Sequence, residues 1–417
     1  MLVEARENRW WMLCVSAVMF DSLVQYFVVN FAGFALPVNA LLPVLLIVAL
    51  YRFGVTATVP GLNSLMPIAV LLFGCLIGVV VVPELGYRKL FEIGTALSAL
   101  IIGYNAFRTV SSDDTLANWF LAIGFIYSAV CSVAIMKLLP SLLPVYYVVG
   151  LREGELVTRA EITIDQNFQI YYLFVCAFAL AAPIRFWRTS LALLACVGAY
   201  FTVAKLQTRS GTILLSLAIA MSLLISMRSN SGGKVKLLFI PLIVLIVGYF
   251  GVDLIKSQGS ELISRFQEKE YETFYSRLFA ASFFIEKLMD PSYWIPQGNA
   301  AYMAKYGGLP HFTPAGFLLE GGILAVIGSL FVFYLPLLRL VVRNLKFRLD
   351  LVANIALVGG VVSLAASLSL NALLFEHMWL WGGAVLGVLV RQISGSQANV
   401  RDVPAAAQVS KPKLLQV

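Results

Sequence analysis

Charged residues are scarce in this chain: they make up 12% of its 417 residues, whereas soluble globular proteins contain about 25%. Hydrophobic residues make up 60% of the chain, and the mean hydropathy is +0.87. No stretch of ordinary polarity is long enough to form a second, water-soluble domain. The composition therefore excludes an ordinary soluble enzyme and indicates an integral membrane protein.

Cysteines and motifs of soluble enzymes are also few. The chain lacks the P-loop, Gly-x-Gly-x-x-Gly, His-Glu-x-x-His and Gly-x-Ser-x-Gly signatures, so ATP hydrolysis, dinucleotide chemistry and serine hydrolysis have no support. The cysteines are odd in number, include no Cys-x-x-Cys pair and lie in apolar runs, which indicates neither a disulfide framework nor a metal site. We expect buried, unreactive thiols at Cys14, Cys75, Cys131, Cys176 and Cys196.

Apolar runs of about twenty residues, long enough to cross a bilayer core, recur from end to end. They predict an all-α, polytopic membrane protein with about twelve transmembrane helices in one domain, residues 1–392. A tail at 393–417, rich in Ala, Gln, Ser and Lys, is expected to be disordered. The first run lacks a small-residue cleavage site and is predicted to be retained. The predicted spans are 10–31, 35–51, 65–82, 90–107, 116–139, 168–184, 189–206, 210–227, 237–255, 316–338, 351–373 and 378–392.

Lys and Arg in short loops predict the orientation, because they are enriched on the cytoplasmic side. The outer short loops hold little besides Arg88, Lys89 and Arg209. The asymmetry accounts for the net charge of +8 without nucleic acid, and it predicts both termini in the cytoplasm of the bacterial inner membrane. The inner segments hold Arg6, Arg9, Arg52, Arg108, Arg185, Arg188, Arg228, Lys234, Lys236, Arg339, Arg343, Lys346, Arg348, Arg391, Arg401, Lys411 and Lys413.

Two outer loops, at about 140–167 and 256–315, are long. Long loops translocate largely regardless of their charge, and loops of such length are usually functional. In the second loop, the spacing of Leu278, Ala281, Ile285 and Leu288 predicts a helix.

Polar residues of four segments meet at the predicted outer face. Arginine carries a permanent charge and a rigid fork of donors suited to phosphate oxygens, so several arginines at the mouth of a bundle suit a lipid diphosphate. The alternative for each is an interfacial charge or a loop salt bridge. Arg209 favours function more strongly, because it lies between two apolar spans with almost no loop. The candidates are Arg152, Arg159, Asp165 and Asn167, then Arg209, then Arg265 and Arg277, and last His311 and Glu320.

The chain has two histidines, and their surroundings differ. His311 lies in a Pro- and Gly-rich approach to the span that carries Glu320, where an imidazole could act as a base near neutral pH. The alternative for His311 is a structural role, capping or packing the loop. His377 is expected to be an interfacial residue of a tight turn.

These features resemble the O-antigen polymerase and ligase superfamily, over about residues 140–340 in order and spacing. The resemblance is carried by an Asp-x-Asn element before one span, an arginine that opens another, and a long outer loop with a second arginine, a histidine and an acidic-Gly-Gly element. Here these are Asp165-Gln166-Asn167, Arg209, Arg277, His311 and Glu320-Gly321-Gly322. Ligases usually have Asn, Ser or Gln after the histidine and a further glycine within the span. This chain has Phe312 and Ala325, which favours a polymerase.

The resemblance implies a metal-independent membrane glycosyltransferase of the C type. It would take a glycan from undecaprenyl diphosphate at the periplasmic face and add it to the next lipid-linked repeat unit of an O-antigen or exopolysaccharide. Arg209 and Arg277 would bind the diphosphate, while His311, helped by Glu320, would activate the acceptor hydroxyl. No cofactor is implied, because the diphosphate is itself the leaving group. The implied partners are the lipid-linked oligosaccharide, membrane lipid and a chain-length regulator protein.

Two alternatives stay open at this point. A ligase would transfer the glycan to lipid A-core instead. A transporter or flippase fits twelve spans equally well, but transporters often carry internal repeats and polar groups at mid-depth. Here the two long loops do not occupy matching positions in the two halves.

Overall fold

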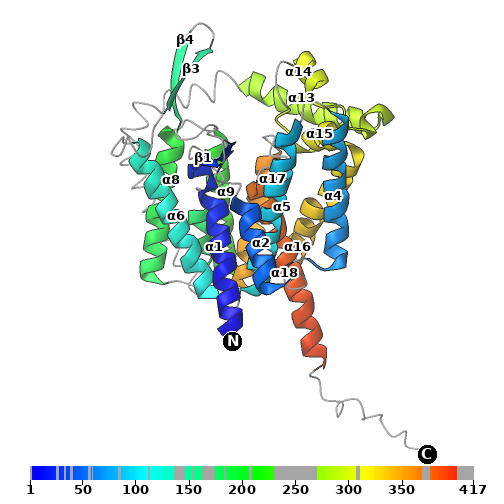
Figure 1. Ribbon diagram of the computed structural model, residues 1–417. Coiled ribbons are helices and arrows are strands. Elements are labelled where there is room, and N and C mark those ends of the chain that lie inside the picture. Colours follow the sequence, from blue (N-terminus) through cyan, green and yellow to red (C-terminus); the bar gives the residue numbers. More distant parts are fainter. Residues whose placement is uncertain are drawn as a thin grey trace, which may run out of the picture.

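The computed structural model shows a bundle of helices (Figure 1) and describes residues 2–24, 28–31, 34–37, 41–54, 58, 60–82, 86–110, 113–135, 146–152, 155–161, 174–182, 185–205, 209–229, 270–306, 310–368 and 376–401. Its helical elements are α1 (Leu2–Val24), α2 (Leu41–Phe53), α4 (Leu62–Val81), α5 (Gly86–Thr109), α6 (Asp113–Ile135), η3 (Phe174–Ala181), α8 (Phe186–Lys205), α9 (Arg209–Ser229), α13 (Glu270–Leu288), η5 (Pro291–Trp294), α14 (Ala300–Tyr306), α15 (Thr313–Ser329), η6 (Leu330–Tyr334), α16 (Leu335–Lys346), α17 (Leu351–Ser367) and α18 (Glu376–Arg401).

Several of these helices are long and apolar enough to cross a membrane. Within the described residues, six segments of this kind occur, and α2 and α17 are shorter apolar helices. The prediction of a helical membrane protein is confirmed at this level. The predicted span at 237–255 lies outside the described residues. The six segments are Ser64–Val81, Lys89–Thr109, Asp114–Val133, Phe186–Val203, Gly211–Arg228 and Thr313–Lys346.

Two β-hairpins depart from the all-α expectation. Strands β1 (Val28–Phe31) and β2 (Phe34–Pro37) pair antiparallel, as do β3 (Tyr146–Arg152) and β4 (Glu155–Glu161). Aromatic and β-branched residues, which favour strands, are concentrated in β1 and β3. Strand β1 therefore occupies the end of the predicted span 10–31, and helix α1 begins and ends earlier than that span, at Leu2 and Val24.

Other boundaries differ from the predicted spans in smaller ways. The span predicted at 168–184 is described over η3 only, where it is a 3₁₀ helix rather than an α-helix. Helix α18 continues to Arg401, so it ends later than the predicted boundary at 392. The predicted helix in the second long loop is confirmed as α13.

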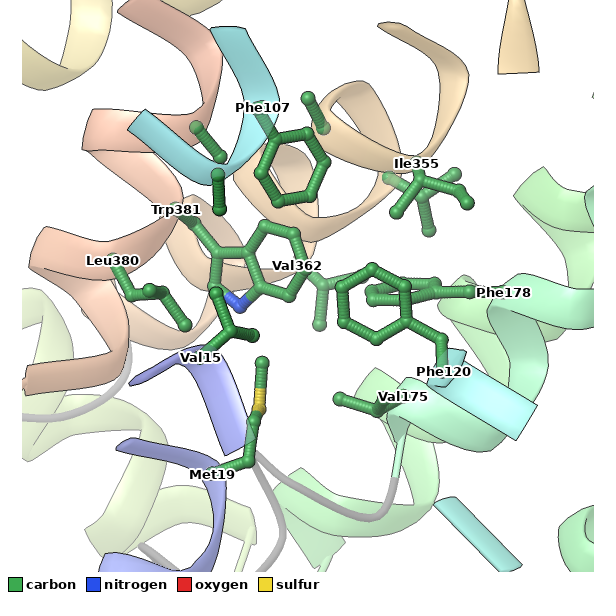
Figure 2. Packing of buried hydrophobic residues seen from close by; sticks show 14 of the residues in the cluster. Val15, Met19, Phe107, Phe120, Val175, Phe178, Ile355, Val362, Leu380 and Trp381 are labelled. Carbon is green, nitrogen blue, oxygen red and sulfur yellow. The ribbon is translucent and has the colours of Figure 1, made fainter. Parts of the chain in front are cut away.

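An aromatic core joins helices that are far apart in the sequence (Figure 2). Trp381 of α18 is buried, and its ring lies edge-on to Phe178 of η3 at 5.1 Å and to Phe107 of α5 at 5.7 Å. Phe120 of α6 lies edge-on to Phe178 at 5.3 Å. Each such pair contributes about 0.5–1.5 kcal/mol beyond the burial of its area. The core therefore holds the C-terminal helix against the middle of the chain.

Glycines permit two especially close helix contacts. A Cβ on Gly383 of α18 would lie 1.9 Å from the carbonyl oxygen of Leu100 in α5. A Cβ on Gly78 of α4 would lie 1.7 Å from the carbonyl oxygen of Glu320 in α15. Small residues spaced four apart bring membrane helices together in this way. The second contact fixes the position of α15, on which the candidate site depends.

Two arginine–aspartate ion pairs mark one end of the bundle. At one end, Arg188 donates to Asp114 at 2.7 Å, and Arg391 pairs with Asp350 and donates to the carbonyl oxygen of Val110. Helix α1 begins and α18 ends at this same end (Figure 1). The hairpin β3–β4 and the helices α13 and α14 lie at the opposite end (Figure 1). The described parts of the long predicted loops thus lie at the opposite end from these ion pairs.

Candidate functional site

Helix α15 is broken at the acidic-Gly-Gly element. Gly322 has a φ of +65° and a ψ of −165°, which interrupts the helix between Thr313 and Ser329. A side chain at Gly322 would be strained by this φ, and its Cβ would lie 2.4 Å from the carbonyl oxygen of Trp294. The glycine therefore allows both the break in α15 and the close approach of the chain at Trp294.

The loop before α14 satisfies a carbonyl group next to the break. The backbone N–H groups of Gln297 and Gly298 both donate to the carbonyl oxygen of Leu319, at 3.0 and 2.8 Å. A break in a membrane helix frees such carbonyl groups, and these must find other donors. The two bonds fix the loop against α15 one residue before Glu320.

Glu320 lies at this break with both carboxylate oxygens engaged. Asn299 donates from its Nδ2 atom to Oε1 of Glu320 at 2.6 Å. Nζ of Lys89, in the first turns of α5, lies 2.8 Å from Oε2. Lys89 also pairs with Glu92 at 3.1 Å. Three separate elements thus meet on one acidic side chain.

Burial strengthens the attraction between Lys89 and Glu320. The side chain of Glu320 is 7% exposed and that of Lys89 is 18% exposed, so water screens their attraction poorly. Removing one partner of a buried pair leaves an uncompensated charge, which costs about 3–5 kcal/mol. The pair therefore links the first turns of α5 firmly to the break in α15.

An aromatic cap packs on the site from α13, η5 and α14. Phe283 of α13 lies 5.0 Å from Tyr302 of α14 and 5.7 Å from Tyr293 of η5, edge-on in both cases. Leu319 of α15 is buried in the same cluster. In α13 the buried residues include Ala280 and Phe283. Leu278 and Ile285, two of the residues from which this helix was predicted, are exposed.

The turn between α13 and η5 is closed by Asp290. Its carboxylate accepts hydrogen bonds from the backbone N–H and the hydroxyl of Ser292, at 3.1 and 2.7 Å. These bonds, together with Lys287, hold the pKa of the Asp290 carboxyl below its usual range. Asp290 is therefore ionised at neutral pH and keeps the cap in register.

The structure places some predicted site residues directly. His311 is exposed in the turn before α15, and Glu320 is buried further along the same helix. Arg277 lies in α13, the helix of the aromatic cap. Only the backbone positions of Arg277, Arg209, Arg152 and Arg159 are described.

Arg209 is the first residue of α9, and its position along the bundle follows from that helix. At the other end of α9, Arg228 donates to the carbonyl oxygen of Leu345, in the last turn of α16. Helix α8, which precedes α9, begins beside Asp114. Arg209 therefore begins α9 at the same end of the bundle as α13 and α14.

The remaining predicted residues are placed only in part. Arg152 ends β3 opposite Glu155, and Arg159 pairs in β4 with Val148. Asp165, Asn167 and Arg265 lie outside the described residues.

Sequence reasoning missed the partners of Glu320. Lys89 was assigned to a short outer loop, whereas it lies in the first turns of α5 and reaches α15. Asn299 stands in the turn before α14 and was not singled out. The spacing of Lys89 and Glu92 is the usual i, i+3 pair, but a contact with Glu320 has no sequence signal.

His377 differs from its predicted interfacial place, because the side chain is fully buried at the start of α18. The five cysteines are buried, as predicted. Within the described part of the chain, His, Cys, Asp and Glu form no cluster of three or more suited to a metal ion.

Comparison with known proteins gives no relative: neither a protein-family model nor a curated protein matches this chain.

Proposed function

We propose that this chain is a polysaccharide polymerase of the bacterial inner membrane, joining undecaprenyl-diphosphate-linked repeat units at the periplasmic face. One observation carries the proposal: the acidic-Gly-Gly element is a built site, with Glu320 buried at a helix break between Lys89 and Asn299. His311 precedes it, and the helices that begin with Arg209 and contain Arg277 reach the same end of the bundle.

The proposed topology has about twelve spans, with both termini in the cytoplasm. The stretch Thr313–Lys346 holds 34 residues, whereas about 20 suffice to cross the apolar core. Counted back from Leu338, the residue before the predicted inner arginines, such a span reaches Leu319, so Glu320 lies at the edge of the core, toward the end that carries the cap. A lipid diphosphate with its tail in the bilayer would present its phosphates at this depth.

The proposed reaction needs a base and a cationic site for the leaving group. The acceptor hydroxyl oxygen forms a bond with the anomeric carbon of the donor glycan, and the bond from that carbon to the diphosphate oxygen breaks. The hydroxyl proton passes to His311, and undecaprenyl diphosphate leaves with the bonding electrons. Arg209 and Arg277 stabilise its charge. Arg152, Arg159, Asp165, Asn167 and Arg265 contribute to binding of the lipid-linked glycans.

A polysaccharide gel of a deletion strain tests this proposal. Loss of a polymerase leaves lipid A-core that carries a single repeat unit. Loss of a ligase leaves lipid A-core without polymer, and a normal ladder rejects both functions.

A transporter is the second candidate, favoured by the break in α15. Discontinuous helices next to buried charges line many transport sites. However, such sites lie near the midplane, whereas the break lies toward one end of Thr313–Lys346. Proteoliposomes separate the two functions: a transporter moves the lipid-linked glycan across the bilayer without changing its length.

A further inference from the structure

We propose that Lys89 is the positioning residue for Glu320, holding its carboxylate in place at the break of α15 for the acceptor side of the reaction. The inference rests on the proposed function and adds to it a residue of α5.

The backbone at Glu320 is held from two directions. Toward α4, the carbonyl oxygen of Glu320 approaches Gly78 so closely that a Cβ on the glycine would lie 1.7 Å away. On the other side, the backbone of Gln297 and Gly298 is bonded to Leu319, the preceding residue. The carboxylate therefore moves only by rotation of its own side chain.

Lys89 and Asn299 restrict that rotation. Each engages one carboxylate oxygen, Lys89 at 2.8 Å and Asn299 at 2.6 Å. The ammonium group is itself held by Glu92 at 3.1 Å. With the side chain of Glu320 only 7% exposed, water cannot replace these partners readily. The geometry is that of a preformed site, in which supporting contacts fix the orientation of a functional group.

The charge of the cluster points to the acceptor rather than to the donor diphosphate. Among the described residues, Lys89 of α5, the thiol of Cys75 in α4 and the uncharged amide of Asn299 face Glu320, and Glu92 pairs with the same ammonium group of Lys89. In this described cluster one ammonium group serves two carboxylates, so the cluster does not attract an anion. A carboxylate held in this way suits a neutral hydroxyl donor or a protonated imidazole such as that of His311.

The central test replaces Lys89 and follows Glu320 in two independent ways. In Lys89→Met, the buried carboxylate loses its counter-ion and takes up a proton instead. A hydrophobic carbodiimide, which attacks protonated carboxyl groups shielded from water, should then label Glu320 in membranes at neutral pH. Wild-type protein should stay unlabelled there. Polymerisation by Lys89→Met should fall by about 10²-fold, the loss expected when a reacting group is displaced by an ångström.

Conservative and matched variants separate positioning from general stability. Lys89→Arg keeps the charge and should restore protection from the carbodiimide and most of the activity. Lys287→Met removes a lysine of the cap that pairs with Glu286 and Asp290 instead, and should change neither readout. Asn299→Ala keeps the ion pair but frees one oxygen of Glu320. It should lower activity by about tenfold without carbodiimide labelling.

Wild-type activity in both Lys89→Met and Asn299→Ala would overturn the proposal, as would loss of activity in Lys89→Arg equal to that in Lys89→Met. If Lys89→Met does not accumulate in membranes, wild-type activity in Asn299→Ala overturns the proposal, and so does loss of activity in Lys89→Arg. The carbodiimide readout needs no catalysis. If Lys89→Met is labelled and the wild type is not, but the wild type polymerises nothing, the polymerase is rejected and the pairing of Lys89 with Glu320 is kept.

Discussion

His311 and Glu320 belong to one short stretch of chain but lie in different surroundings. His311 is exposed before α15, whereas the carboxylate of Glu320 is enclosed and ion-paired with Lys89. An exposed imidazole can exchange its proton with water after each turnover. In the proposed mechanism the roles therefore divide: His311 would take the proton, and Glu320 would orient the group that loses it.

The first prediction concerns His311. A positioned base contributes about 10²–10⁴-fold, so His311→Ala should lower polymerisation by that factor while the melting temperature in detergent stays unchanged. His377→Ala should show the reverse: this side chain is fully buried, so the melting temperature should fall. Steady-state rates and thermal unfolding of the purified variants measure both effects. A normal rate in His311→Ala would remove the residue from the mechanism and leave Glu320 as the candidate base.

The second prediction concerns the arginines. Arg209→Ala and Arg277→Ala should each lower polymer formation by at least about 10²-fold, because they remove the guanidinium groups proposed to stabilise the leaving diphosphate. Lysine should rescue poorly, since a point charge does not reproduce the bidentate fork. Alanine at Arg152, Arg159 or Arg265 should have weaker effects. Polymer on a gel and protein in the membrane fraction are the two measurements.

A matched control lies at the opposite end of the bundle. Arg348 is exposed, and Arg348→Ala should leave polymer formation unchanged. Normal polymer in Arg209→Ala or Arg277→Ala would refute the assignment of that arginine to the diphosphate.

At the scale of elements, the site depends on a helix that is broken and closely packed. Gly322 makes the break, and Gly78 of α4 admits the backbone of α15. In a continuous helix the carbonyl oxygen of Leu319 would accept a hydrogen bond from the N–H group of Ile323, whereas here it accepts from Gln297 and Gly298. The break therefore creates the place where α5, α14 and α15 meet.

The third prediction tests this contact. In Gly78→Ala, the added methyl group meets the backbone of Glu320, and the overpacking should cost about 1–3 kcal/mol. The melting temperature and the activity should both fall. Gly94→Ala in α5 is the control, because no described atom beyond its own stretch of helix lies within 4 Å of its added Cβ. There the substitution should stabilise the helix by about 0.5–1 kcal/mol. Equal melting temperatures of the two variants would contradict the close contact between α4 and α15.

The sequence predicts elements of this protein better than it predicts their partners. Periodicity predicted α13 as a helix, but two of the apolar residues used for that prediction, Leu278 and Ile285, are exposed. The side chains of α13 that are buried include Ala280 and Phe283. Hydropathy identified the apolar runs but not the hairpin β1–β2, because β-branched and apolar residues favour a strand and a span alike. Lys89 was visible as a charge, yet its contact with Glu320 joins positions far apart in the chain. Such contacts follow from packing, which one sequence does not reveal.

At the scale of the molecule, the two ends of the bundle have different characters. Arginines at one end form Arg188–Asp114 and Arg391–Asp350, where α1 begins and α18 ends. The cap and the candidate site lie at the other end (Figure 1). In the proposed topology, the end with these two ion pairs faces the cytoplasm.

The fourth prediction concerns this orientation. In a Cys-free background, Ser292→Cys in η5 should react with an impermeant thiol reagent in intact spheroplasts, because this exposed position lies in the proposed outer loop 256–315. Lys346→Cys, exposed at the end of α16, should react only after lysis. The reverse pattern would invert the topology and place the candidate site in the cytoplasm.

The most direct test of the polymerase is a reaction with purified protein in lipid nanodiscs and undecaprenyl-diphosphate-linked repeat units, followed by mass spectrometry of the products. We predict a ladder of lipid-linked glycans, each one repeat unit longer than the last. One free undecaprenyl diphosphate should appear for each bond formed. Repeat units that stay single in this reaction, but move to lipid A-core when it is supplied, would contradict the polymerase and identify a ligase.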